Sequence, residues 1–139
     1  MVPNHLKLRD VDDNIIVLGD IHINSSLSEE FESNRLSRIA KYIRDVSFDR
    51  IIVLAGDTFD RNVPSLVDIK LFYQFIKELN IRNGENQILV INGNHDVTTF
   101  FHLPNAGFRY IATATVVNEK IMLVPYNELS MLEEHLKDN

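Results

Sequence analysis

Three short runs of apolar residues mark the first two thirds of the chain, and a polar turn with a glycine follows each run at once. The runs cover residues 14–19, 50–55 and 87–91. Their apolar character is continuous rather than alternating, which is typical of strands that are buried on both faces of a parallel or mixed sheet. We therefore predict three inner strands of a layered sheet.

Two segments with helical periodicity separate these predicted strands. Residues 27–46 carry an apolar stripe at intervals of three and four, and Ser26 with Glu29 fits a capping box at the start. The second predicted helix covers residues 65–79, with Pro64 suited to its first turn. The order β-α-β-α-β predicts an α/β fold with crossover connections, in which ligands bind beyond the carboxyl ends of the strands.

Smaller elements are predicted at both ends of the chain. Residues 1–13 are polar and aperiodic, with room for a short edge strand. Residues 108–117 and 121–126 are rich in β-branched or apolar side chains and predict two more strands, joined by a hairpin turn at 118–120. A final amphipathic helix is expected over residues 128–137.

Composition limits the classes of function. The chain has 139 residues, of which 45% are apolar and 24% charged, so we expect residues 1–139 to form a single globular domain. No apolar run is long enough to cross a membrane, and the N-terminus lacks the apolar core of a signal peptide. We therefore expect no membrane association and a cytoplasmic location. The absence of cysteine excludes disulfides, thiolate metal sites and a cysteine nucleophile.

The net charge of −6 argues against a broad basic surface that grips nucleic acid through phosphate contacts alone. The same charge is compatible with carboxylates that are gathered to hold cations. Asp20, Asp57, Asp60 and Asp96 are four of the twenty acidic residues. Two bound divalent ions would offset their charge locally.

The turns after the three predicted strands carry the candidate chemistry. They read Gly19-Asp20-Ile21-His22, Gly56-Asp57-Thr58-Phe59-Asp60 and Asn92-Gly93-Asn94-His95-Asp96. In an extended backbone the side chains at i and i+2 point the same way, so Asp20 and His22 could bind one ion. Asp57 and Asn94 would add oxygen ligands from the ends of the neighbouring strands.

Oxygen and nitrogen ligands without sulfur suit Mn²⁺, Fe or Zn²⁺ better than a soft metal. A carboxylate reached from both sides can bridge two ions, and two ions about 3.5–4 Å apart can clamp a phosphoryl group and generate a hydroxide nucleophile. His95 follows a ligand directly and suits proton transfer to a leaving oxygen, with Asp96 to orient it. Gly19, Gly56 and Gly93 would allow the tight turns and leave space for ions and phosphate.

Each turn taken alone also has an ordinary explanation. Asp20-x-His22 could be a surface turn, Asp60 could cap a loop, and the third segment could be a polar turn. The three turns occur together in this order, and each follows a pattern typical of a buried strand. This combination favours a metal site.

The three turns together resemble the signature of the calcineurin-like metallophosphoesterases, which is Asp-x-His, then Gly-Asp-x-x-Asp, then Gly-Asn-His followed by Asp or Glu. The match spans about residues 14–97. The resemblance implies two divalent ions, with Mn²⁺ expected and Fe, Zn²⁺ or Mg²⁺ as alternatives. It implies that Asp20 and His22 bind the first ion, that Asp57 bridges both ions and that Asn94 binds the second.

Within this family, the sequence Gly-Asp-Thr-Phe-Asp-Arg at residues 56–61, followed by Pro64 and an aromatic-rich helix, is similar to the Mre11/SbcD-type DNA-repair nuclease branch. This likeness implies a DNA exo- or endonuclease subunit of phage or bacterial type, which hydrolyses phosphodiester bonds by a two-metal mechanism. His95 would assist the leaving group and Asp96 would support it. A small-molecule phosphodiesterase, a protein phosphatase and a non-catalytic binding module are the alternatives.

The family pattern continues with a Gly-His pair and a Gly-His-x-His motif, whose histidines complete both metal shells. This chain has no Gly-His dipeptide. We therefore expect the N-terminal part of a metallophosphoesterase domain, incomplete at its C-terminal side, with the remaining ligands supplied by a continuation or a partner chain. The open sheet edge predicts self-association or a second polypeptide that covers it.

Overall fold

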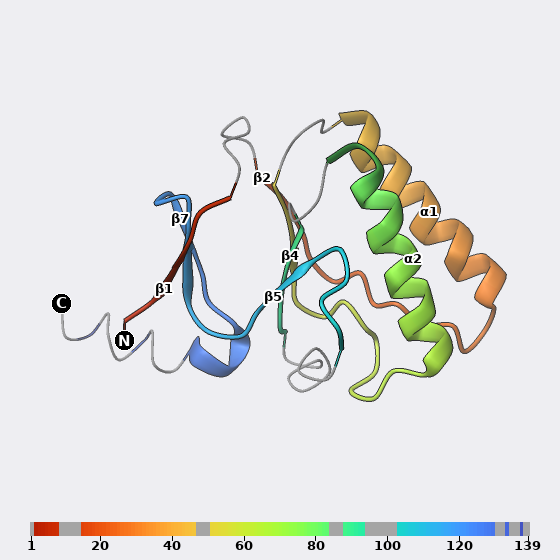
Figure 1. The fold of residues 1–139 in the computed structure, drawn as a ribbon. Coiled ribbons are helices and arrows are strands. Elements are labelled where there is room, and N and C mark those ends of the chain that lie inside the picture. Colours follow the sequence, from red (N-terminus) through yellow and green to blue (C-terminus); the bar gives the residue numbers. More distant parts are fainter. Residues whose placement is uncertain are drawn as a thin grey trace.

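A computed structural model describes residues 2–8, 15–46, 51–83, 88–93 and 103–129, together with residues 133 and 137 (Figure 1). Its main sheet has four parallel strands in the order β2-β3-β4-β5. These strands are β2 (Ile15–Leu18), β3 (Ile51–Ala55), β4 (Ile88–Ile91) and β5 (Arg109–Ile111). The three strands expected from the apolar runs are therefore confirmed. Burial on both faces is confirmed for β3 and β4 but not for β2, which is an edge strand of the described sheet and in which Val17 is 59% exposed.

Two helices connect the first three strands of this sheet. Helix α1 (Glu29–Val46) lies between β2 and β3 in the chain, and α2 (Leu66–Asn83) lies between β3 and β4. Both helices cover the same face of the sheet (Figure 1). Successive crossovers between neighbouring parallel strands turn with the same hand, which places their helices on one side. The core between the helices and the sheet includes Ile52, Leu54 and Phe72, all fully buried.

A small second sheet covers the opposite face (Figure 1). It consists of β1 (Asn4–Leu6), β6 (Thr115–Val117) and β7 (Ile121–Leu123) in the order β1-β6-β7. Strand residues that point away from the helices, such as Val53 and Leu89, pack with Val117 and Leu123 of this sheet. The layered α/β fold is thus confirmed, and the continuous apolar runs of β3 and β4 are explained because both faces of these strands are covered. The second cover is a sheet rather than helices.

The start of α1 differs from the predicted one. The helix begins at Glu29, and Ser28 caps it, because the Ser28 hydroxyl accepts a hydrogen bond from the Phe31 N–H at 3.1 Å. The predicted capping box at Ser26 is wrong. Ser26 instead donates its N–H to the Asn24 side chain at 2.9 Å, which is the pattern of an Asx turn before the helix.

The start of α2 is a capping box that the sequence reading did not identify. The Ser65 hydroxyl accepts from the Asp68 N–H at 3.1 Å, and the Asp68 carboxylate accepts from the Ser65 N–H at 3.0 Å. Aspartate here takes the place that glutamate or glutamine usually fills. Pro64 precedes the cap and does not lie in the first turn of the helix.

The C-terminal part also departs from expectation. The single strand predicted over residues 108–117 is divided, because β5 joins the main sheet and β6 joins the small one. The predicted hairpin is confirmed: β6 and β7 are antiparallel, and Asn118 and Glu119 supply the left-handed backbone with φ of 51° and 60°. After β7 the chain forms a short 3₁₀ helix (Tyr126–Glu128). Most of the helix expected over 128–137 lies outside the described residues.

Candidate metal centre

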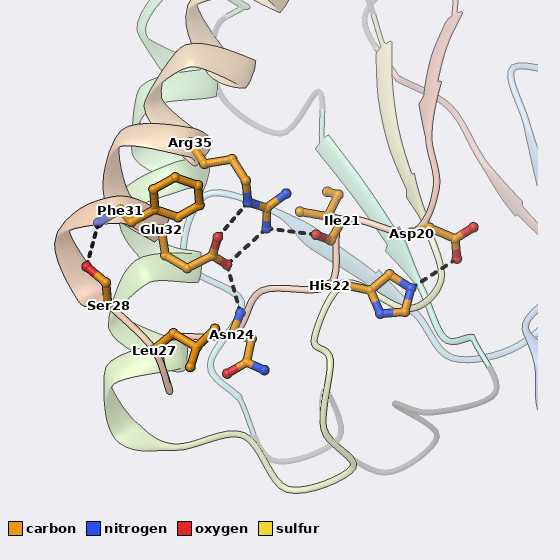
Figure 2. Close-up of a pocket in the computed structure, with 9 residues that line it drawn as sticks. All are labelled: Asp20, Ile21, His22, Asn24, Leu27, Ser28, Phe31, Glu32 and Arg35. Atoms are coloured by element: carbon orange, nitrogen blue, oxygen red, sulfur yellow. Dashed lines mark hydrogen bonds and ion pairs between the residues drawn. The ribbon is translucent and has the colours of Figure 1, made fainter.

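The carboxyl ends of β2 and β3 bring three ligand-type side chains together. Asp20 and His22 follow β2, and Asp57 follows β3; one ligand atom from each lies within 4.8 Å of the others. The His22 Nε2 lies 3.5 Å from the Asp20 Oδ1, and Figure 2 shows the imidazole ring directed at that carboxylate. Two carboxylates and an imidazole without sulfur are a donor set that fits a divalent cation.

All three residues adopt an unusual backbone conformation. Their φ angles are 55° at Asp20, 52° at His22 and 49° at Asp57, in the left-handed region that non-glycine residues seldom occupy. Such conformations cost on the order of 1–3 kcal/mol each and concentrate at functional sites. The expectation that an extended backbone aligns Asp20 with His22 is therefore wrong. Left-handed turns bring them together, and the side chain of Ile21 between them is buried.

Backbone hydrogen bonds hold the two loops in these conformations. They run between the loop after β2 and the loop after β3: Asp20 N–H to Gly56 O at 3.3 Å, His22 N–H to Asp57 O at 3.0 Å, and Ile23 N–H to Thr58 O at 2.8 Å. The loops therefore continue the pairing of the strands past their ends, which fixes the separation of the three ligand-type side chains.

Asp60 orients the imidazole of His22. The His22 Nδ1 lies 3.0 Å from Asp60 Oδ1, and the Asn24 amide donates to Asp60 Oδ2 at 2.8 Å. These hydrogen bonds from Asn24 and His22 lower the pKa of Asp60 below its usual value. An ionised carboxylate can only accept, so this contact favours the form of His22 with a proton on Nδ1. In that form Nε2, which lies 3.5 Å from Asp20 Oδ1, is the ring nitrogen that could bind a metal ion.

An ion pair between the buried Glu32 and the half-buried Arg35 attaches the loop after β2 to helix α1 (Figure 2). The Glu32 carboxylate accepts from the Asn24 N–H at 2.8 Å and from the Arg35 guanidinium at 2.9 Å, and Arg35 also donates to the Ile21 carbonyl at 2.9 Å. Burial alone would raise the pKa of Glu32, but the hydrogen bonds from Arg35 and Asn24 outweigh it and lower that pKa. None of these contacts is predicted from the sequence, whose helical periodicity would place Arg35 on a solvated helix face.

A second buried carboxylate attaches the same loop to helix α2. Asp68 is fully buried and accepts from the N–H and the hydroxyl of Ser25 at 2.8 and 2.6 Å, besides its bonds to Ser65. Burial would raise the pKa of Asp68, but the hydrogen bonds from the two serines lower it. The loop that carries His22 is thus bonded to both helices.

Two glycines let the ends of β3 and β4 approach each other. A Cβ at Gly93 would lie 2.5 Å from the Asp57 nitrogen and 2.7 Å from Asp57 Oδ1, and one at Gly56 would lie 2.8 Å from the Gly93 Cα. The backbone of Gly93 therefore lies directly against the Asp57 carboxylate. The expected need for glycine at a tight turn is confirmed for Gly56 and Gly93. The turn at Gly19 does not need a glycine, because a Cβ there would meet only the Ala55 carbonyl at 3.9 Å. The space that these glycines would leave for ions and phosphate stays a prediction.

The remaining predicted site residues, Asn94, His95 and Asp96, lie outside the described residues. The residue that precedes Gly93 is described: Asn92 is buried, and its side-chain amide donates to the Tyr110 hydroxyl at 2.6 Å. This bond fixes the end of β4 to the adjoining strand β5. Within the described ranges, no helix is both long and apolar enough to cross a membrane.

Comparisons with known proteins identify the family of the chain. The family model for calcineurin-like phosphoesterases matches residues 14–135. The DNA double-strand break repair protein Mre11 of Nanoarchaeum equitans is 35% identical over 79 residues, which are 57% of this chain and 21% of that protein. SbcD, a component of the nuclease SbcCD of Bacillus subtilis, is 39% identical over 72 residues, which are 52% of this chain and 17% of that protein. The matched part thus spans about a fifth of the length of each relative.

The family match covers most of the chain and includes all three turns that carry the predicted site residues. Its name and those of the two relatives support a hydrolase of the metallophosphoesterase class. The chain belongs to the calcineurin-like phosphoesterase family.

Proposed function

We propose that this chain forms part of a metal-dependent nuclease that hydrolyses phosphodiester bonds in DNA. The observation that carries the proposal is the convergence of Asp20, His22 and Asp57 within 4.8 Å at the carboxyl edge of a parallel sheet in a chain of this family. The names of the two relatives, a break-repair protein and a nuclease subunit, favour DNA over cyclic nucleotides or phosphoproteins as the substrate.

In this proposal Asp20 and His22 would hold the first of two divalent ions, Asp57 would serve as a ligand to both, and Asn94 would hold the second. Mn²⁺ is the proposed ion, with Fe, Zn²⁺ or Mg²⁺ as alternatives that offer similar chemistry. Such ions, when bound, activate water and neutralise charge on a phosphoryl group. Asp60 keeps the Nε2 of His22 available as a ligand, as its contact with the Nδ1 suggests.

His95 and Asp96 are proposed to serve the leaving group. An imidazole next to the metal ligand Asn94 would donate a proton to the departing oxygen, and a carboxylate beside it would orient the ring. The support is the sequence Gly93-Asn94-His95-Asp96 together with the position of Gly93 against the Asp57 carboxylate.

We further propose that residues 1–139 act as one unit in a larger assembly. The sequence has no Gly-His dipeptide, so further histidine ligands would come from outside these residues, through a continuation, a second chain or self-association. The name of one relative, a nuclease subunit, is compatible with such an assembly. A cytoplasmic location and a phage or bacterial origin stay predictions from the sequence.

Calorimetric titration with MnCl₂ and hydrolysis of bis(p-nitrophenyl) phosphate test the proposal together. We expect the unmodified chain to bind Mn²⁺, Asp57→Asn to lose that binding, and Asp45→Asn to retain it. Asp45 is a matched control because it is an exposed aspartate on α1. Among the ion pairs of the described residues, it takes part in one, with Lys41 at 3.8 Å. Equal heats for Asp57→Asn and the unmodified chain would refute the metal centre and favour a non-catalytic module.

A substrate panel then separates the classes of phosphoesterase. Single-stranded DNA, a cyclic nucleotide and a phosphopeptide are compared at equal Mn²⁺ concentration, with the assembly as purified. Preference for the cyclic nucleotide or the phosphopeptide would overturn the proposed substrate while leaving the phosphoesterase chemistry in place.

A further inference from the structure

A cavity of about 380 Å³ opens beside the candidate metal centre. Asp20 and His22 line one end, Leu27 and Phe31 line the other, and the Glu32–Arg35 pair lies between them (Figure 2). The volume is near the lower end of the range of roughly 300–1,000 Å³ that is typical of small-ligand sites. The cavity is therefore continuous with the residues proposed to bind the first metal ion.

The far end of this cavity is apolar and exposed. Leu27 is 100% exposed and Phe31 is 62% exposed, although both are large apolar side chains. Single exposed apolar residues are common on protein surfaces, but two that line one cavity with metal ligands are a stronger observation. The ring of Phe31 also stands on a fixed backbone, because its N–H is bonded to the Ser28 hydroxyl in the first turn of α1.

The charges of the cavity do not favour a phosphate at this end. Among the described residues that line the cavity, Arg35 is the only lysine or arginine, and its guanidinium already donates to Glu32 and to the Ile21 carbonyl. An anion placed at this end would also meet the carboxylate of Glu32. A flat, uncharged group with an apolar face fits better.

We propose that Phe31 and Leu27 form a subsite for the base of an unpaired nucleotide that neighbours the scissile phosphate. The inference rests on the proposed nuclease function and names the part of the substrate that this surface takes. Stacking of a base on an aromatic ring tolerates any sequence, since every base has a π-face. It also offers a way for a chain with a net charge of −6 to hold a nucleic acid without a broad basic surface.

The chain has no tryptophan, so Phe31→Trp introduces a single fluorescent reporter at the subsite. Tyr42→Trp is the matched control, since Tyr42 is 70% exposed on the same helix and lies about 16 Å along the axis from Phe31. The probes are a phosphorothioate octathymidylate and an abasic octamer of equal charge, added with Mn²⁺. We expect octathymidylate to quench the emission of Phe31→Trp, the abasic octamer to leave it unchanged, and Tyr42→Trp to respond to neither.

Affinity measured by anisotropy of a labelled octathymidylate gives a second readout. Phe31→Ala should bind about 5- to 150-fold more weakly, the loss that removal of one stacking contact produces. Phe31→Tyr should keep the affinity, and all variants should bind Mn²⁺ as the unmodified chain does. Because Phe31 is exposed, these substitutions leave the core intact.

Three outcomes would overturn the subsite. Octathymidylate that binds without changing the Phe31→Trp emission refutes it, and so does equal quenching by the abasic octamer; in both cases the proposed nuclease function stands. The third outcome is that neither octathymidylate nor the abasic octamer binds, while Mn²⁺ binds and bis(p-nitrophenyl) phosphate is hydrolysed. This result would refute both the subsite and DNA as the substrate, and would leave only the phosphoesterase activity.

Discussion

Replacement of Gly93 by alanine perturbs the closest approach between two strand ends. The added Cβ would lie 2.5 Å from the Asp57 nitrogen and 2.9 Å from the Gly56 Cα, both of which are backbone atoms. Neither can move without shifting the end of β3, so we expect the overpacking to lower the free energy of unfolding by about 1–3 kcal/mol. The Cβ would also lie 2.7 Å from Asp57 Oδ1 and displace that carboxylate, which should weaken Mn²⁺ binding.

Gly19→Ala is the matched control. Gly19 also lies in a turn that ends a strand and precedes a ligand-type aspartate. A Cβ added there would lie 3.9 Å from the nearest atom, and the backbone φ of Gly19 is not positive. At such a position alanine restricts the unfolded chain and stabilises the fold by about 0.4–1 kcal/mol. The two variants should therefore change the free energy of unfolding in opposite directions: Gly93→Ala should lower it and Gly19→Ala should raise it.

Urea denaturation followed by far-ultraviolet circular dichroism measures both variants, and calorimetry measures their Mn²⁺ affinity. If Gly93→Ala is as stable as Gly19→Ala and binds Mn²⁺ equally well, the strand ends do not meet as described, and the reasoning about Asp57 fails with it.

Three further predictions concern the residues around the candidate site. Asp60→Asn should weaken Mn²⁺ binding about 10- to 100-fold, because it disturbs the tautomer of His22, whereas Asp45→Asn should not; equal affinities in calorimetry would refute the orienting role. Asp68→Ala leaves the serine donors around it without their carboxylate and should lower the free energy of unfolding by about 1.5–3 kcal/mol in urea denaturation; an unchanged midpoint would show that the loop needs no such anchor. The folded-state pKa values of Glu32 and Asp68 lie below their ordinary values of 4.5 and 3.8. Their stabilisation is thus fully present above those values and is lost as the pH falls through the lower folded-state pKa values. Urea denaturation of the unmodified chain from pH 6 to about pH 2 should show a free energy of unfolding that falls below about pH 4.5, and the fall should be shallower for Glu32→Gln. Parallel pH curves for the unmodified chain and Glu32→Gln would contradict the lowered pKa of Glu32.

Much of the layered fold follows from the sequence alone. The continuous apolar runs predict β2, β3 and β4. For β3 and β4 the reason is that inner strands of a covered parallel sheet need apolar side chains on both faces, whereas β2 lies at the edge of the described sheet. Strand ends of parallel neighbours meet at one edge, so the motif spacing also predicts that Asp20, His22 and Asp57 lie together. These inferences rest on patterns within single elements or on general topology.

The features that the sequence does not predict depend on competition between two residues for one helix cap, or on hydrogen-bond partners that are far apart in the sequence. Ser26 and Ser28 both offer a hydroxyl for the helix cap, and Ser28 forms it. Ser26 lies instead in a turn with Asn24, in a loop that Glu32 and Asp68 bind through the backbone N–H groups of Asn24 and Ser25. Asp68 looks like an ordinary polar helix residue, since its partner Ser25 is 43 residues away. The left-handed φ of His22 arises from pairing between two loops, which no local propensity encodes.

The most direct test of the metal centre is anomalous diffraction at the manganese absorption edge from crystals soaked in MnCl₂. The proposal predicts a peak bonded to an oxygen of Asp20, the Nε2 of His22 and an oxygen of Asp57, each at about 2.0–2.3 Å as in other divalent sites with these ligands. A peak elsewhere on the surface, or none at these three residues under saturating Mn²⁺, would contradict it.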